Sequence, residues 1–182
     1  MRSGRRAERL AALREPVGRE GGWGAWITSL GLLMVLGILQ VSDAAVWGGV
    51  RTDPTLALAV SWALVSGPRH GLVFGVAAGL VQDLLLGQSF LYTGLRALLG
   101  LGAGLARPLL NVQQPLVILP VVLLASMLQD LVVVAILGAW TRWAALWPWR
   151  LLADLAVSVP IFLVARRLWS PAGGWTVGGR SG

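Results

Sequence analysis

Six stretches of apolar residues, separated by short polar segments, follow one another along the chain between residues 23 and 168. They cover residues 23–41, 55–66, 71–86, 93–110, 115–139 and 151–164. An α-helix needs about 20 residues to cross the hydrocarbon core of a bilayer, and it satisfies its own backbone hydrogen bonds there. The pattern therefore predicts an all-α integral membrane protein, a bundle of six transmembrane helices of which two are short.

The polar segments between these stretches predict loops at residues 42–54, 67–70, 87–92, 111–114 and 140–150. The last loop holds four tryptophans, which indicates an aromatic anchor at the outer membrane surface or, alternatively, an exposed contact for a partner. We expect residues 1–22 to form a cytoplasmic Arg-rich tail and residues 169–182 a flexible cytoplasmic tail. Residues 23–168 are then the six-helix transmembrane domain.

The composition supports a membrane protein. Apolar side chains make up 56% and charged ones 13% of the 182 residues, whereas soluble domains average about 45–50% and about 25%. A chain this short cannot hide that excess in one water-surrounded core, which excludes an ordinary soluble globule and a disordered chain. The absence of cysteine excludes a disulfide scaffold and a cysteine nucleophile. The single histidine, His70, is expected in a loop at the membrane interface and argues against a His-rich metal site.

All fifteen basic residues are arginines, and the formal net charge is +7. Six of them precede the first apolar stretch, at Arg2, Arg5, Arg6, Arg9, Arg14 and Arg19. With six helices and both termini in the cytoplasm, eleven arginines lie inside and four outside, as the positive-inside rule requires. The charge thus indicates membrane topology, with lipid binding by the tail as the alternative. It does not indicate nucleic-acid binding, for which arginines would share a face with polar and aromatic residues.

Glycines recur every fourth residue in two neighbouring apolar stretches. The third stretch carries Gly71, Gly75 and Gly79, and the fourth carries Gly100 and Gly104. Residues four apart lie on one face of a helix, and faces of small residues let helix backbones approach closely in lipid. The two faces suit each other as packing partners within the bundle. The alternative is a groove that receives a helix of another membrane protein.

Five charged residues fall within apolar stretches, and one of them, Arg107, lies near the end of the fourth stretch. We call the other four the predicted polar layer: Asp83, Arg96, Asp130 and Asp154. A charge near the bilayer centre costs about 3 kcal/mol, so such groups usually face the bundle interior and are paired. Their positions along the helices put all four toward the outer side, with Asp83 and Arg96 at similar depth. We expect an Asp83–Arg96 ion pair. The layer is then either a buried network that fixes helix register or a small polar site open to the periplasm.

The sequence contains no recognisable enzyme motif. There is no Gly-x-Ser-Gly serine with a suitably placed histidine, no Gly-x-Gly-Asp of the intramembrane aspartyl type and no His-Glu-x-x-His. A Walker motif needs a lysine, and the chain has none. We therefore expect a protein without catalytic residues, cofactor or metal.

The third and fourth stretches together resemble the rod shape-determining protein MreD family. The resemblance is carried by the glycine-stepped segment 71–87, GLVFGVAAGLVQDLLLG, with its Gly-Leu-x-x-Asp step ending at Asp83. It continues in Gly94-Leu-Arg-Ala97-Leu98 at the start of the next helix, where the arginine departs from the family pattern. The length, the number of spans, the short loops and the cytoplasmic termini also agree with the family.

The resemblance implies a non-enzymatic scaffold of the bacterial cell-elongation machinery in the inner membrane, supporting peptidoglycan synthesis along the side wall. Its direct partner would be MreC, whose transmembrane helix would lie against the glycine faces. MreB, RodA and a class B penicillin-binding protein would belong to the larger complex. The family is also similar in fold to the S components of energy-coupling-factor transporters, so a vitamin-binding transporter subunit is the alternative. Such a subunit needs a sizeable outward cavity with convergent polar groups.

The six-helix topology predicts a cytoplasmic C-terminus. Alkaline phosphatase folds to its active form only outside the cytoplasm, so a fusion of this enzyme to the C-terminus should be inactive in cells. An active C-terminal fusion would contradict the six-helix arrangement, because an odd number of spans would then separate the two termini.

Overall fold

The computed structural model describes residues 23–42, 46–47, 50–87, 90–138 and 140–169. Within these ranges the chain is almost entirely helical, which confirms the predicted all-α class. The Arg-rich tail 1–22 and the predicted flexible tail beyond Trp169 lie outside the described residues.

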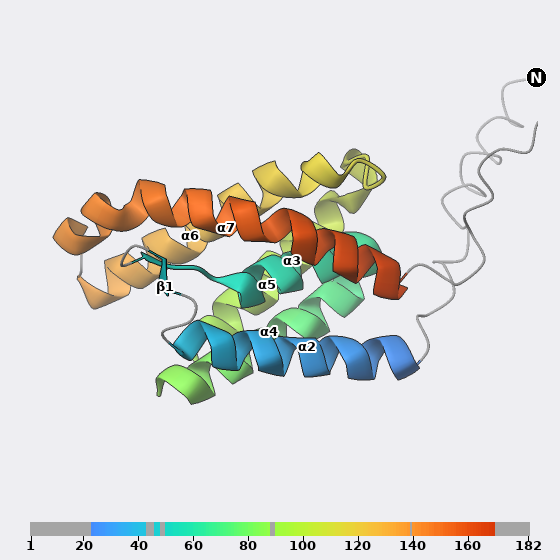
Figure 1. The fold of residues 1–182 in the computed structure, drawn as a ribbon, viewed down its shortest axis with the longest axis horizontal. Helices are drawn as coiled ribbons and strands as arrows, with labels where there is room; N and C mark the ends of the chain where they lie inside the picture. Colours follow the sequence, from blue (N-terminus) through green and yellow to red (C-terminus); the bar gives the residue numbers. More distant parts are fainter. Residues whose placement is uncertain (1–22, 43–45, 48–49, 88–89, 139, 170–182) are drawn as a thin grey trace, which may run out of the picture.

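The described residues form six α-helices, which are α2 (Trp23–Val41), α3 (Pro54–Ser66), α4 (Pro68–Leu86), α5 (Leu91–Ala106), α6 (Ile118–Leu137) and α7 (Trp140–Trp169). Two short 3-10 turns join α5 to α6, η2 (Arg107–Leu109) and η3 (Pro115–Val117). Two antiparallel strands lie between α2 and α3, β1 (Val46–Trp47) and β2 (Val50–Arg51). Figure 1 shows α7 above and α2 below in this view, with α3 between them.

Helix α3 is the centre of the bundle. Twelve of its thirteen residues are buried, and it packs against α2, α4, α5, α6 and α7. A helix that is apolar on all sides belongs in an interior. Its two serines do not disturb this packing, because Ser61 donates a hydrogen bond to the Ala57 carbonyl at 2.6 Å. Ser66 donates in the same way to the Trp62 carbonyl at 2.7 Å. The short second apolar stretch is thus the core helix.

Both ends of α3 are fixed by local sequence. At the start, the Asp53 side chain accepts the Leu56 N–H at 2.9 Å, and Pro54 occupies the first helical position, where its missing N–H costs nothing. At the end, Gly67 adopts a φ of 95°, which strongly favours glycine, and its N–H donates to the Ala63 carbonyl. Pro68 then begins α4 directly, so the two helices meet in a tight turn.

The glycine faces form the contact between α4 and α5. A Cβ atom would lie closer than 3.0 Å to the backbone of the facing helix at each of Gly71, Gly75, Gly79, Gly100 and Gly104. The neighbour of Gly75 is the Arg96 carbonyl, while Gly71 and Gly100 face each other. The two faces therefore pack on one another, as their spacing predicts. Of the two interpretations that the spacing left open, packing within the bundle is the one found here, because α5 fills the groove on α4.

An aromatic cluster joins α2, α3, α4 and α7 near the α3–α4 turn. The ring of Trp62 stacks on Phe74 with 4.8 Å between centroids and meets Trp169 edge-on at 4.6 Å. Trp26 of α2 packs on the same group, 5.4 Å from Trp62. His70, which was expected in a loop, lies in the first turn of α4, and its ring is 5.7 Å from that of Trp26. These rings hold the ends of four helices together.

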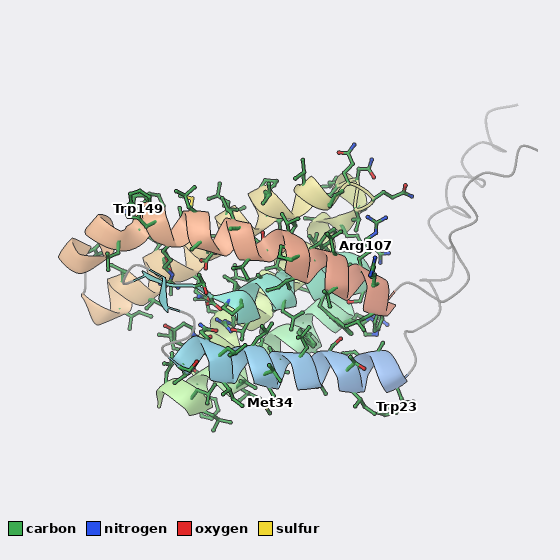
Figure 2. The ribbon with its side chains drawn as sticks, in the orientation of Figure 1. Trp23, Met34, Arg107 and Trp149 are labelled. Atoms are coloured by element: carbon green, nitrogen blue, oxygen red, sulfur yellow. The ribbon has the colours of Figure 1, made fainter. Side chains whose placement is uncertain are left out.

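The outer surface of the bundle is strongly apolar. Trp23 is 85% exposed and Leu84 is 81% exposed. Figure 2 shows Trp23, Met34 and Trp149 projecting outward from α2 and α7. Three helices, α2, α4 and α6 with its preceding turn, have the length and composition to cross a membrane. Apolar surfaces of this extent are rare on soluble monomers, so the structure supports a membrane protein. The number of six spans stays a prediction.

Two predicted loops contain regular structure instead. The segment 42–54 includes the paired strands β1 and β2, and the segment 140–150 is the first third of the continuous helix α7. With 30 residues, α7 is about 45 Å long, longer than the hydrocarbon of a bilayer. The prediction of a loop there was wrong: the tryptophan-rich segment continues the helix, with Pro148 inside it. Proline is tolerated in membrane helices, since neighbouring groups satisfy the carbonyl that it frees.

Replacing Gly75 by alanine tests the close approach of α4 and α5. The new methyl group would collide with backbone atoms of α5, which cannot move away as a side-chain tip can. We expect Gly75→Ala to lower the free energy of unfolding by about 1–3 kcal/mol. In the detergent-solubilised protein this corresponds to a fall in Tm of roughly 3–10 °C.

Gly102→Ala is the matched control on α5. A Cβ atom at Gly102 meets no heavy atom within 4 Å, and alanine favours a helix by about 1 kcal/mol over glycine. The Tm of this variant should be unchanged or higher. Equal melting temperatures for the two variants would show that the glycine faces are not tightly packed.

Candidate functional site

A fully buried arginine, Arg96 of α5, lies at the centre of a polar cluster inside the bundle. Its guanidinium forms an ion pair with Asp53. It also donates to the side-chain oxygen of Gln129 at 3.2 Å and to the hydroxyl of Thr55 at 2.6 Å. A further hydrogen bond of 3.3 Å reaches the Ala78 carbonyl of α4. All three guanidinium nitrogens therefore have partners, which come from the start of α3, from α4 and from α6.

Asp53, which precedes α3, links Arg96 to the rest of the cluster. One carboxylate oxygen caps α3 by accepting the Leu56 N–H, and the other accepts from Gln129 at 2.7 Å as well as from Arg96. The Asp53 N–H donates to a carboxylate oxygen of Asp154 at 2.7 Å. The positive charge of Arg96 and the hydrogen bonds from Gln129 and the Leu56 N–H all stabilise the charged form of Asp53. Asp53 is therefore a carboxylate.

Two acids of the predicted polar layer, Asp154 and Asp130, lie in the same region as Asp53. Asp154 of α7 accepts the Asp53 N–H and, at 3.3 Å, the hydroxyl of Ser126 on α6. Asp130 of α6 forms an ion pair with Arg150 of α7 at 3.1 Å. The polar contacts thus tie α3, α5, α6 and α7 together, and three members of the predicted layer, Arg96, Asp130 and Asp154, gather there.

The expected Asp83–Arg96 ion pair is wrong. The Asp83 carboxylate accepts the Thr93 N–H at 2.8 Å, the Thr93 hydroxyl at 2.6 Å and the Tyr92 N–H at 3.1 Å. These N–H groups belong to the first turn of α5, which has no carbonyl partners of its own. Asp83 therefore caps α5 from the end of α4. Similar depth in the bilayer did not identify the partner of Arg96, because several acids lie at that depth.

Sequence reasoning missed Asp53 and Arg150, because both fall in segments that predict loops. A signal for Asp53 exists in the sequence, since Asp-Pro before an apolar run is typical of a helix N-cap followed by proline at the first position. The triplet Gln-Asp-Leu also occurs twice in the sequence, at 82–84 and 129–131, and both of its glutamines take part in these polar contacts. Gln129 binds Arg96, and Gln82 accepts from the Thr55 hydroxyl at 3.2 Å.

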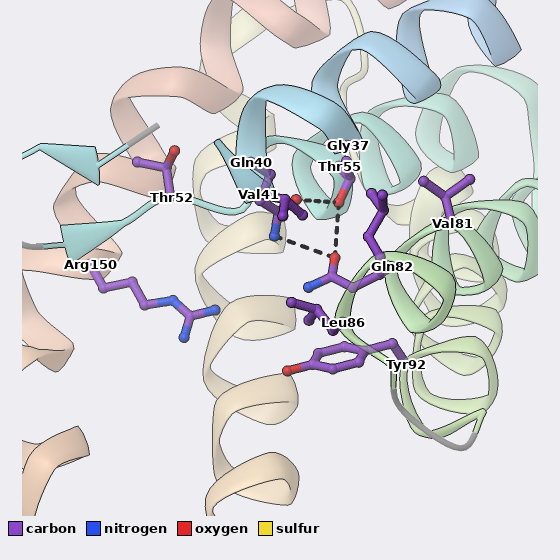
Figure 3. Close-up of a pocket in the computed structure, with 11 residues that line it drawn as sticks. Gly37, Gln40, Val41, Thr52, Thr55, Val81, Gln82, Leu86, Tyr92 and Arg150 are labelled. Atoms are coloured by element: carbon purple, nitrogen blue, oxygen red, sulfur yellow. Dashed lines mark hydrogen bonds between the residues drawn. The ribbon is translucent and has the colours of Figure 1, made fainter. Parts of the chain in front are cut away.

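A cavity of about 130 Å³ adjoins this cluster where α2 and α4 end. Its polar lining comes from Gln40, Thr52, Thr55, Gln82, Tyr92 and Arg150. Figure 3 shows Gln40, Thr55 and Gln82 joined by hydrogen bonds on one side of the cavity, with 2.8 Å from Thr55 to Gln40 and 3.3 Å from Gln40 to Gln82. Arg150 approaches from the opposite side.

The chemistry of the cluster is that of structural support. Arg96 and Asp53 satisfy each other and their neighbours, so neither is held in reserve for a substrate. In the part of the chain that the structure describes, no three residues of the His, Cys, Asp and Glu types are grouped to hold a metal ion. Buried ion pairs with complete hydrogen bonding can specify which helices pack together and in which register.

Comparison with known proteins gives no match to a protein-family model, to a curated protein or to a solved structure.

Replacing Arg96 by glutamine tests the central ion pair. The variant leaves the Asp53 carboxylate buried without its cation, which should lower the free energy of unfolding by about 3–5 kcal/mol. Adding Asp53→Asn removes the remaining charge, so the double variant should be more stable than Arg96→Gln alone. Thermal unfolding in detergent measures both effects, and Arg69→Gln, at an exposed position in α4, serves as the control without an effect. A double variant less stable than the single one would argue against the pairing.

Proposed function

We propose that this chain is a non-enzymatic scaffold subunit of the MreD type in the bacterial cytoplasmic (inner) membrane. All six helices lie in the bilayer, and both termini are cytoplasmic. The direct partner is the transmembrane helix of MreC, and MreB, RodA and a class B penicillin-binding protein belong to the larger complex. The fold supports this proposal because the described helices are joined by short connections, so that a partner is met by helix faces and turns.

The observation that carries the proposal is the light packing of α2. This helix buries only Ser29, Leu33 and Gly37, and the rest of its surface is partly or fully exposed. Its exposed face carries Gly24 and Gly31, and a Cβ atom on either would meet no heavy atom within 4 Å. Residues seven apart lie on nearly the same side of a helix. A peripheral helix with small residues on its open face suits the docking of a second transmembrane helix.

We assign the MreC helix to this open face of α2, and not to the glycine face of α4. The α4 face is in backbone contact with α5, whereas Gly24 and Gly31 have open space beside them. Docking on α2 therefore needs no rearrangement of the bundle.

The size of the cavity favours the scaffold over the transporter alternative. Small-molecule pockets are typically about 300–1,000 Å³, and the cavity beside Gln40 and Gln82 measures about 130 Å³. A vitamin would also need polar groups that are free to bind it, but those around Arg96 are bonded to one another. Tight binding of a labelled vitamin by the purified protein would favour an S component instead.

The α2 assignment predicts that Gly31→Leu reduces co-purification with MreC. The added side chain would hold a docked helix several ångströms away and remove its close backbone contacts. We expect the amount of MreC recovered with the tagged protein to fall at least tenfold. The Tm of the variant should not change, because the position is open in the isolated bundle.

Gly102→Leu is the matched control, since Gly102 is also an exposed glycine with open space beside it, but on α5. Its recovery of MreC should equal that of the unmodified chain. Full recovery of MreC with Gly31→Leu would rule out the α2 face as the docking surface. An equal loss with both variants would show that any added bulk in the membrane disturbs the complex.

A further inference from the structure

The cavity beside Arg150 lies at one end of the bundle. Gln40 is the last residue but one of α2, Leu86 is the last of α4, and Tyr92 lies in the first turn of α5. Helix α4 has 19 residues and is about 28 Å long, close to the thickness of the hydrocarbon. Its end therefore reaches the level of the lipid headgroups, on the side that the arginine distribution predicts to be periplasmic.

Arg150 gives this cavity a positive charge. Arg150 is the one charged residue among the described residues that line the cavity. One of its terminal nitrogens pairs with Asp130 at 3.1 Å, but its Nε is buried and has no hydrogen-bond partner within the described chain. Figure 3 shows the guanidinium of Arg150 and the hydroxyl of Tyr92 directed into the same space. The Arg150 side chain is 31% exposed, so the part of its guanidinium that faces the cavity can donate to an anionic oxygen of a ligand there.

The rim of the cavity is apolar and faces outward. Val41, Leu85 and Leu86 line the cavity and are also 37%, 39% and 37% exposed. They lie on α2 and α4, two of the helices with the length and composition of membrane spans. A ligand in the cavity therefore has a polar end beside Arg150 and an apolar path along these side chains toward the bilayer.

We propose that the cavity binds a membrane phospholipid, with a phosphate oxygen accepting hydrogen bonds from Arg150 and acyl chains lying against Leu85 and Leu86. Arginine binds phosphate through strong charge-assisted hydrogen bonds. A volume of about 130 Å³ admits a phosphate group but not a whole lipid, so the glycerol and the chains remain at the rim. Such a lipid occupies a site on the side of α2 and α4 and needs no opening of the buried Arg96 cluster.

Native mass spectrometry of the full chain in detergent tests this proposal. Phosphatidylglycerol should be retained, and diacylglycerol with the same acyl chains, which lacks the phosphate, should bind at least tenfold more weakly. The double variant Arg150→Gln with Asp130→Asn removes the guanidinium without leaving its acid partner unpaired. It should weaken phosphatidylglycerol binding about tenfold, whereas Arg107→Gln, at the opposite end of α5, should leave the affinity unchanged.

A second variant decides the question if the double variant does not fold. Leu86→Trp narrows the mouth of the cavity and keeps the Arg150–Asp130 pair, so it should also weaken phosphatidylglycerol binding severalfold. Equal binding of phosphatidylglycerol and diacylglycerol would overturn the proposal, as would full affinity in the Leu86→Trp variant. Inorganic phosphate serves as the third ligand. If it binds alone and displaces phosphatidylglycerol in an Arg150-dependent way, the site takes a free anion, and the assignment to a lipid is wrong.

Discussion

The buried guanidinium of Arg96 constrains most of this bundle. Removing such a charge from water costs several kcal/mol even after the protein relaxes, so the fold has to bring an acid and neutral acceptors to it. Asp53 pairs with Arg96, caps α3 and donates its own N–H to Asp154. Gln129 binds both members of the pair. Since these contacts come from different helices, sliding one helix past another would leave a buried charge or a helix end without its partner.

The same constraint explains why α3 is short. Its thirteen residues make a helix about 20 Å long, which is less than the thickness of the hydrocarbon. The helix begins at Asp53, which is 2% exposed, inside the bundle. Strands β1 and β2 lie between the end of α2 and this buried point. They pair with each other, so some of their backbone N–H and C=O groups have hydrogen-bond partners. A short apolar stretch in a membrane sequence is here the core helix, and its N-cap is the partner of a buried arginine.

Features that repeat at a fixed spacing could be predicted from the sequence, whereas single long-range contacts could not. The four-residue spacing of glycines identifies a close helix contact, because one backbone geometry gives it. The apolar stretches likewise locate the helices, although the tryptophan-rich segment 140–150 was not predicted to belong to α7. The depth of a residue along its helix predicts that Arg96 lies near several acids. It does not predict that the ion-pair partner of Arg96 is Asp53 and not Asp83. That choice depends on where α3 begins, and so on the packing of the whole bundle.

The polar groups in the interior of the bundle bind one another, so a partner or ligand is expected to bind at the periphery. Within the bundle, every nitrogen of the Arg96 guanidinium and both carboxylate oxygens of Asp53 already bind neighbouring groups. At the edge, Arg150 pairs with Asp130 and also lines a cavity, and α2 has open space beside Gly24 and Gly31. A self-contained core with an open periphery suits the proposed scaffold, because a scaffold acts by holding its partners at a fixed geometry. A transporter subunit has the opposite requirement, since its interior must release groups to bind a substrate and then give it up.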